Sequence, residues 1–260
     1  MKDSQNSNDK LNELSPIKSM GQLLASFLVA ECIIEIRGER ETKIKKMAID
    51  SLPKLQIKDS RAEALYKRYA QAVNFTPTFV YLCKIGLEDM KRYNFKKDPS
   101  VVTSVSNDTS HLQEAFGSTY AALANIDLEE HTLNVFENGI AAGEKKGRIM
   151  QTALPMLACL FHDFGKSSEL RNELLGENIG RGYRAHAEVS EIYIREILAA
   201  KYHTKFEEQS IETIEKLANI VKNHHPANKK LRSDTMIAFV INSDIMARKE
   251  EIRLLKQKMK

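Results

Sequence analysis

Apolar and polar residues follow one another along most of the chain in a helical pattern. From residue 111 onward this pattern predicts a succession of helices with short polar breaks between them. Two more helical stretches precede it, one from about residue 16 to 37 and one from about residue 58 to 93. We therefore predict an all-α fold. The helices predicted in the C-terminal part span residues 111–124, 127–146, 148–161, 185–201, 206–225 and 233–257.

Residues with turn and cap chemistry mark the ends of these helices. Ser15 is suited to be the N-cap of the first helix, with Pro16 at its first position. The glycine-rich stretch ELLGENIGRGYRA, residues 173–185, is predicted to be a loop. Pro226 stops the fifth helix of the C-terminal part because proline cannot continue a helix. Asp234, preceded by a serine, is predicted to cap the last helix.

The composition changes along the chain and suggests a domain organisation. Residues 1–15 are polar and are predicted to form a disordered tail, and residues 16–95 form an N-terminal helical region. Residues 96–110, KKDPSVVTSVSNDTS, are rich in Ser, Thr, Asp and Asn and are the best candidate for a linker. Residues 111–260 form the remaining domain.

Charge, cysteine usage and hydropathy limit the class of protein. The net charge of +4 permits an anionic ligand but does not require nucleic acid as a partner. The three cysteines, Cys32, Cys83 and Cys159, lie far apart in apolar settings and predict core thiols in a reducing compartment. The longest apolar stretch, residues 23–34, contains a glutamate and is shorter than the roughly 20 residues that span a bilayer. We expect a cytoplasmic protein without a membrane segment, and the oligomeric state stays open.

Histidines and aspartates stand at the ends or on the faces of the predicted C-terminal helices. They come singly or as adjacent pairs from five different elements, as in a helical bundle whose side chains converge on its core. Zinc-finger spacing, with ligands in close pairs separated by two to four residues, does not occur. The residues concerned are His131, His162, Asp163, His186, His224, His225 and Asp244.

These residue types suit metal chemistry. Imidazole nitrogens and carboxylate oxygens bind divalent first-row metals. Four neutral histidines and two aspartates supply enough ligands for two ions if one carboxylate bridges them. A hydroxide held between two such ions is a good nucleophile near neutral pH, because the ions lower the pKa of water towards about 7. The pattern therefore predicts a centre that attracts an anionic substrate.

The order of these residues resembles the HD superfamily of metal-dependent phosphohydrolases. HDFGK, residues 162–166, is similar to the HD-x-G-K form of the family motif, and SDIMAR around Asp244 is similar to its final Asp-x-x-Ala-Arg segment. His186 and one of the paired histidines fall where the two-metal branches carry additional histidines. The resemblance covers roughly residues 111–257. It implies a helical bundle with a mono- or dinuclear metal centre, to which residues 16–95 would be an N-terminal helical extension.

Carried over residue by residue, the resemblance implies roles for the site. Asp163 would bridge the ions and Lys166 would hold a phosphate oxygen, so these two are the candidate catalytic residues. His186 and His224 would complete a second metal position. The complete ligand set implied is His131, His162, Asp163, His186, His224 and Asp244.

Other polar residues near the site have plainer alternatives. Arg181 and Arg184 lie in the glycine-rich loop, where they either clamp a phosphate or are simply solvated. His225 is a candidate substrate contact or a donor that supports a ligand, and Arg248 is a candidate to orient Asp244 from one helical turn away. The segment HHPANKK departs from the cyclic-dinucleotide phosphodiesterase subgroup, which has a glutamate after its paired histidines.

The sequence thus predicts a metal-dependent phosphohydrolase acting on a phosphomonoester or phosphodiester, a nucleotide among the candidates. The metal could be Mn, Fe, Ni, Zn or Mg. Two alternatives remain: a di-iron oxygenase on the same ligands, and a non-catalytic module in nucleic-acid processing of a mobile element. Iron and oxygen consumption would distinguish the first alternative, and salt-dependent DNA binding without turnover would distinguish the second.

Overall fold

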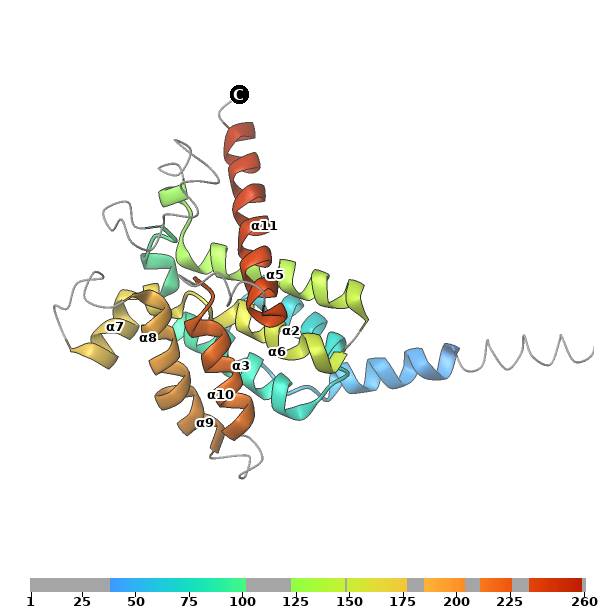
Figure 1. Ribbon diagram of the computed structural model, residues 1–260. Helices are drawn as coiled ribbons and strands as arrows, with labels where there is room; N and C mark the ends of the chain where they lie inside the picture. Colours follow the sequence, from blue (N-terminus) through green and yellow to red (C-terminus); the bar gives the residue numbers. More distant parts are fainter. Residues whose placement is uncertain are drawn as a thin grey trace, which may run out of the picture. The chain divides into compact units, whose positions relative to one another are not determined.

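The computed structural model describes most of the chain as helices connected by short turns (Figure 1). The described residues are 38–101, 123–147, 149–176, 185–203, 211–225 and 234–258. Within these ranges there is no strand, and the prediction of an all-α fold is confirmed. The predicted helix at residues 16–37 and most of the one at 111–124 lie outside the described residues. The labelled elements are, in chain order, α2 (Ser60–Ala72), α3 (Pro77–Arg92), η1 (Phe95–Lys97), α5 (Leu128–Lys146), α6 (Ile149–Phe161), η3 (Phe164–Lys166), α7 (Ser168–Leu175), α8 (His186–Tyr193), the π-helical turn η4 (Ile194–Leu198), α9 (Ala199–His203), α10 (Ile211–Lys222) and α11 (Thr235–Lys258).

The chain divides into two compact units. Residues 1–51 form one, of which a helix at residues 38–50 is described, and residues 52–260 form the other. In the first unit, Lys45 and Glu41 form an exposed ion pair one turn apart on the helix. In the second unit, α2 contacts α3 and α5, and α3 contacts α6. The predicted linker at residues 96–110 stays a prediction, and its residues 102–110 lie outside the described part.

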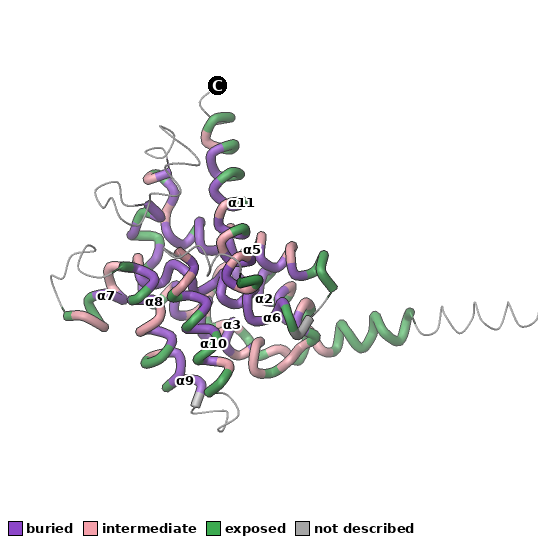
Figure 2. The backbone as a smooth tube through the Cα atoms, in the orientation of Figure 1, coloured by how far each residue is buried: buried purple, intermediate pink, exposed green. Residues whose placement is uncertain are grey.

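Helix α6 is the central helix of the larger unit. It contacts α3, α5, α10 and α11, and its residues 152–161 are all buried (Figure 2). Its sequence there is apolar on every face, as expected for a helix surrounded by others. Burying each of its large side chains stabilises the fold by roughly 1.5–3 kcal/mol. This buried segment leads directly into the His162-Asp163 pair.

Gly139 lets α5 lie close to α6. A Cβ atom at this position would come within 2.8 Å of the Cys159 sulfur, well inside van der Waals contact. The two helices that supply His131 and the His162-Asp163 pair are thus packed with little space between their backbones. Cys159 and Cys83 are buried free thiols, and Cys32 lies outside the described residues.

The helical stretch at 58–93 is two helices rather than one. α2 ends at Ala72 and α3 begins at Pro77, a favourable first position for proline. Between them Asn74 and Phe75 have positive φ angles of 50° and 55°. A left-handed phenylalanine has no clear sequence signature, whereas Pro77 was a usable signal for the second helix.

Two further features differ from the prediction. Helix α7 is not among the predicted helices; its last three residues fall in the stretch predicted to be a loop, and Gly176 follows its end. Its signal was Ser167, whose hydroxyl accepts a hydrogen bond from the backbone N–H of Leu170 at 3.2 Å. Helix α10 ends at Lys222, three residues before the predicted end, so the paired histidines lie in the turn that follows.

The remaining helices follow the prediction closely. Asp234 caps α11 by accepting a hydrogen bond from the backbone N–H of Met236 at 2.8 Å. Among the residues that the structure describes, no helix has both the length and the apolar character needed to cross a bilayer.

Candidate metal centre

The candidate ligands reach one another from five elements. His131 lies near the N-terminus of α5, where Asp127 caps the helix by accepting from the backbone N–H of Glu130 at 2.7 Å. The His162-Asp163 pair directly follows α6, and His186 is the first residue of α8. The other two come from later in the chain: His224 follows α10 and Asp244 lies in α11.

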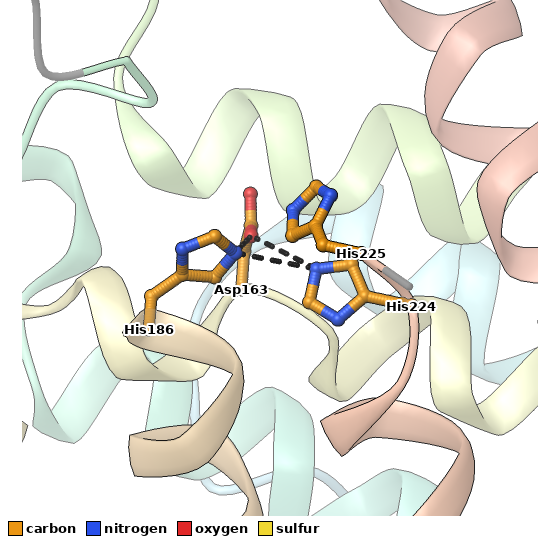
Figure 3. Close-up of side chains that lie close together, drawn as sticks. All are labelled: Asp163, His186, His224 and His225. Atoms are coloured by element: carbon orange, nitrogen blue, oxygen red, sulfur yellow. Dashed lines mark hydrogen bonds and ion pairs between the residues drawn. The ribbon is translucent and has the colours of Figure 1, made fainter. Parts of the chain in front are cut away.

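Asp163 lies at the centre of the group, and its two carboxylate oxygens face different histidines. Oδ2 is 3.2 Å from Nε2 of His162 and 3.5 Å from Nε2 of His131. Oδ1 is 3.1 Å from Nε2 of His186 and 3.8 Å from Nε2 of His224 (Figure 3). One carboxylate therefore separates two pairs of imidazoles.

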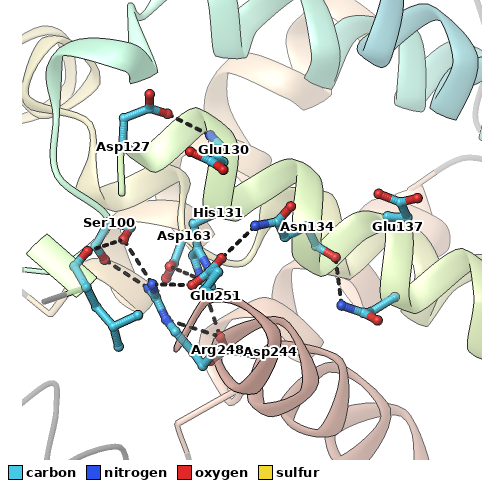
Figure 4. A network of polar contacts seen from close by, with 12 residues as sticks. Ser100, Asp127, Glu130, His131, Asn134, Glu137, Asp163, Asp244, Arg248 and Glu251 are labelled. Carbon is cyan, nitrogen blue, oxygen red and sulfur yellow. Dashed lines mark hydrogen bonds and ion pairs between the residues drawn. The ribbon is translucent and has the colours of Figure 1, made fainter. Parts of the chain in front are cut away.

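Asp244 completes the first of these groups. Its Oδ1 is 3.2 Å from Nε2 of His131, the same nitrogen that lies near Asp163 (Figure 4). When two ligand atoms each lie about 2.1 Å from a metal ion and the angle between the two bonds is a right angle, the ligand atoms are about 3 Å from each other. The separations between these nitrogen and oxygen atoms are close to that value. All six residues named as ligands from the sequence are thus brought together.

The ring orientation of three histidines is fixed by hydrogen bonds from Nδ1. His162 donates to the carbonyl of Cys159 at 2.9 Å, and His224 donates to the carbonyl of Val221 at 2.6 Å. His131 Nδ1 bonds to the carboxylate of Glu251 at 2.9 Å. These partners accept hydrogen bonds and do not donate them, so Nε2 is the nitrogen that each ring presents to the centre.

The centre is buried, and several of its polar atoms lack hydrogen-bond partners. His131 and His162 are fully buried and Asp163 is 1% exposed. Nε2 of both histidines, Oδ1 of Asp163 and Oδ1 of Asp244 make no hydrogen bond. Leaving such groups unpaired in a protein interior costs free energy. Divalent cations bound among these side chains would satisfy the unpaired atoms, so the residues present fit a metal centre.

The carboxylates and histidines shift one another's pKa values. Burial opposes ionisation of Asp163 and Asp244. The neighbouring histidines outweigh it, together with Lys166 at Asp163 and Arg248 at Asp244, and hold both pKa values below the usual range. Burial and Arg248 lower the pKa of His131, but the surrounding carboxylates outweigh both and raise it to about 9. In the metal-free protein a proton on His131 thus supplies positive charge between carboxylates.

In the second histidine group, which contains His186 and His224, the pKa of His224 is lowered and not raised. Burial lowers the pKa of His224 to about 4, with help from the nearby His186 and His162. Nε2 of His186 and Nε2 of His224 are 3.3 Å apart. The His225 ring centroid is 4.0 Å from that of His224, and His225 offers a ligand atom to the same group as Asp163, His186 and His224.

The remaining residues named from the sequence have different positions. Lys166 donates to Oδ2 of Asp163 at 2.7 Å and to the carbonyl of Ser100 at 3.2 Å, so it lies beside the centre. Arg248 is 3.9 Å from Oδ1 of Asp244, at the limit of an ion pair. Arg181 and Arg184 lie outside the described residues, and their predicted contact with phosphate stays a prediction.

Sequence reasoning missed Glu251 and Ser100. Glu251 lies two helical turns after Asp244 on α11 and is 2% exposed, and the nearby His131 and Arg248 hold its pKa down at about 2 despite burial. Its spacing from Asp244 was a usable signal, because residues seven apart share a helix face. Ser100 contacts the site from a distant part of the chain and had no such signal.

Comparison with known proteins agrees with this geometry. The HD domain family matches residues 128–258, which is half of the chain and includes every candidate ligand. No curated protein and no solved structure matches the chain. The family consists mostly of metal-dependent hydrolases, and the buried His and Asp groups could hold a metal ion. The resemblance seen in the sequence is confirmed: the chain belongs to the HD domain family.

Proposed function

We propose that the protein is a metal-dependent phosphohydrolase whose centre holds two divalent ions bridged by Asp163. One observation carries this proposal. Oδ2 of Asp163 faces His131 and His162, whereas Oδ1 faces His186 and His224. A carboxylate that presents its two oxygens to two histidine pairs is placed as a bridging ligand is.

The two ions would have different ligand sets. The first would be held by His131, His162, Asp163 and Asp244, and the second by Asp163, His186 and His224, with His225 as a further donor. Imidazole and carboxylate donors suit Mn, Fe, Ni, Zn or Mg. With two M²⁺ ions and two carboxylates, the net charge of the centre favours an anionic substrate.

Bound divalent ions supply charge to polarise a phosphate ester and make a coordinated water acidic near neutral pH. The chain's own groups would orient the substrate around that charge. The Lys166 ammonium, 2.7 Å from Oδ2 of Asp163, is close enough to the centre to donate to a phosphate oxygen as well. The burial of the ligands keeps bulk water away and strengthens these interactions.

The substrate class follows from this charge. A phosphomonoester or phosphodiester matches a dinuclear centre with an adjacent lysine, and a nucleotide is one such substrate. Nucleic acid remains a possible partner through the same chemistry, and we propose no membrane partner.

The proposal is tested by phosphate-ester hydrolysis. Purified protein, reconstituted with Mn²⁺ under argon, is assayed with nitrophenyl phosphate, bis-nitrophenyl phosphate and a panel of nucleotides. We expect product release that stops when the metal is removed by a chelator and returns when it is added back. Turnover that requires both iron and O₂ would favour the oxygenase instead. Salt-dependent DNA binding with no turnover of any ester would favour the non-catalytic module.

Gly165 of the HDFGK segment gives the first variant prediction. A Cβ atom here would overlap the backbone carbonyl of His186 and come within 2.8 Å of Cβ of Val189. Gly165→Ala should therefore push α8 away and move His186 from Asp163. We expect a loss of about 1–3 kcal/mol in unfolding free energy, together with loss of one bound metal per chain.

The matched control is Gly38→Ala, because a Cβ atom at Gly38 would meet nothing within 4 Å. Denaturant unfolding and elemental analysis are performed on both variants. Wild-type stability and metal content in the Gly165→Ala protein would show that α8 does not need this close approach.

The pKa of His131 predicts how metal binding depends on pH. The ring carries a proton below about pH 9 in the metal-free protein, and a metal ion at Nε2 must displace it. Metal affinity should therefore rise with pH, by up to about tenfold per unit, and level off near pH 9. His224, with a pKa of about 4, is already neutral in this range and adds nothing. Competition titrations with a chelator between pH 6.5 and 9 measure the slope, and an affinity that does not change with pH would contradict it.

A further inference from the structure

Glu251 connects His131 to a buried network that reaches a distant part of the chain. Its Oε1 bonds to Nδ1 of His131 at 2.9 Å and accepts from the Asn134 amide at 2.8 Å. Its Oε2 accepts from Nη1 of Arg248 at 2.9 Å (Figure 4). The carboxylate is thus held by three donors from two helices.

Arg248 is itself anchored from outside these helices. Nη1 donates to the hydroxyl of Ser100 at 2.9 Å, and Nη2 donates to the Ser100 carbonyl at 3.2 Å. Arg248 and Ser100 are both fully buried. The same carbonyl of Ser100 accepts from Lys166 at 3.2 Å. Ser100 therefore accepts hydrogen bonds from two positively charged side chains that adjoin the centre, Arg248 and Lys166.

The position of Glu251 determines which ring nitrogen of His131 carries the proton and which keeps a lone pair for a metal ion. An ionised carboxylate only accepts hydrogen bonds, so the ring must carry a proton on Nδ1. A neutral His131 is then left with its lone pair on Nε2, which lies 3.2 Å from Asp244 and 3.5 Å from Asp163. The other tautomer would place a proton where an ion has to bind.

From these contacts, and building on the dinuclear centre proposed above, we infer that Glu251 is a positioning residue for metal binding. It fixes His131 in the tautomer that ligates through Nε2, and the Ser100–Arg248 pair fixes Glu251. Partners of this kind typically change metal affinity by 10–100-fold when they are replaced.

Glu251→Gln is a sharp test because glutamine has the same shape but one donor and one acceptor. The guanidinium of Arg248 can only donate, whereas His131 can change tautomer and the Asn134 amide can rotate to present its oxygen, so the glutamine oxygen turns towards Arg248. The amide NH₂ then faces Nδ1 of His131, which has to accept, and the ring proton moves to Nε2. The variant should thus favour the tautomer that cannot bind the ion.

The matched control is Glu250→Gln, on the same helix. Glu250 is exposed and bonds to Arg253 at the surface, so this change removes the same charge without touching His131. Zn²⁺ affinity is measured for wild type and both variants by competition with a chromogenic chelator, and circular dichroism verifies the helical fold.

We expect Glu251→Gln to weaken the binding of one Zn²⁺ by about 10–100-fold, with Glu250→Gln within twofold of wild type. Equal affinity in wild type and Glu251→Gln would overturn the inference and leave the proposed centre intact. If the wild type binds no Zn²⁺, the proposed centre is wrong and the inference falls with it.

A second measurement needs no substitution at Glu251. ¹⁵N-histidine NMR of the Zn²⁺-loaded wild type reports which ring nitrogen carries the proton, and loss of the signal in His131→Gln assigns it. A proton on Nδ1 of His131 and metal on Nε2 are expected. Metal on Nδ1 would overturn the inference even if the Glu251→Gln protein failed to fold.

Discussion

Asp163→Asn is expected to weaken metal binding by more than about 100-fold at both positions of the centre and to abolish metal-dependent turnover. Loss of a hydrogen-bond partner outside the ligand set already costs 10–100-fold, and here a ligand shared by both ions is changed. Asparagine keeps one oxygen, so its NH₂ must face one of the two histidine pairs that Oδ1 and Oδ2 now face. The metal position that still faces the asparagine oxygen loses the negative charge of the Asp163 carboxylate.

Metal content after dialysis and Zn²⁺ affinity measure this effect. The control is Glu250→Gln, which removes an exposed carboxylate. A variant that retains one ion at wild-type affinity would show that Asp163 belongs to a single metal position and does not bridge.

Phe164→Ala is expected to lower the free energy of unfolding by about 3–5 kcal/mol. Phe164 follows the His-Asp pair and is fully buried. Its ring lies 4.8 Å from that of Phe95, 5.0 Å from that of Phe161 and 4.9 Å from that of Tyr193, measured between centroids. Truncation would leave a cavity where elements from four parts of the chain meet.

Denaturant unfolding in the presence of chelator measures this effect without a contribution from bound metal. Leu254→Ala is the control, since Leu254 is 41% exposed and its truncation should cost little. A loss of less than about 1 kcal/mol in Phe164→Ala would mean that the neighbouring side chains collapse into the space.

The candidate ligands could be selected from the sequence because metal chemistry restricts the residue types and because each candidate lies in or next to a predicted helix. Three of the candidates lie within helical, partly apolar segments: His131, Asp163 and Asp244. Burying such polar groups costs free energy unless a partner such as a metal ion compensates. The region that matches the family contains all three. The structure adds what spacing could not give, namely that the two oxygens of Asp163 face separate histidine pairs.

The supporting network was not predictable in the same way. Ser100 and Arg248 are 148 residues apart in sequence and meet only through the packing of the folded chain. Serine in a polar stretch is common, so its type gives no signal. The break between α2 and α3 was missed for a local reason, because Asn74 and Phe75 adopt left-handed conformations that side chains rarely take.

Metal stoichiometry tests the central claim most directly. Tag-free protein, purified without chelator and reconstituted with a single divalent metal, is analysed for metal per chain beside a His162→Ala/Asp163→Ala variant. A dinuclear centre predicts two ions per chain in the wild type and loss of both in the variant. One ion would confine ligation to a single histidine group, and no ion after reconstitution would contradict the account.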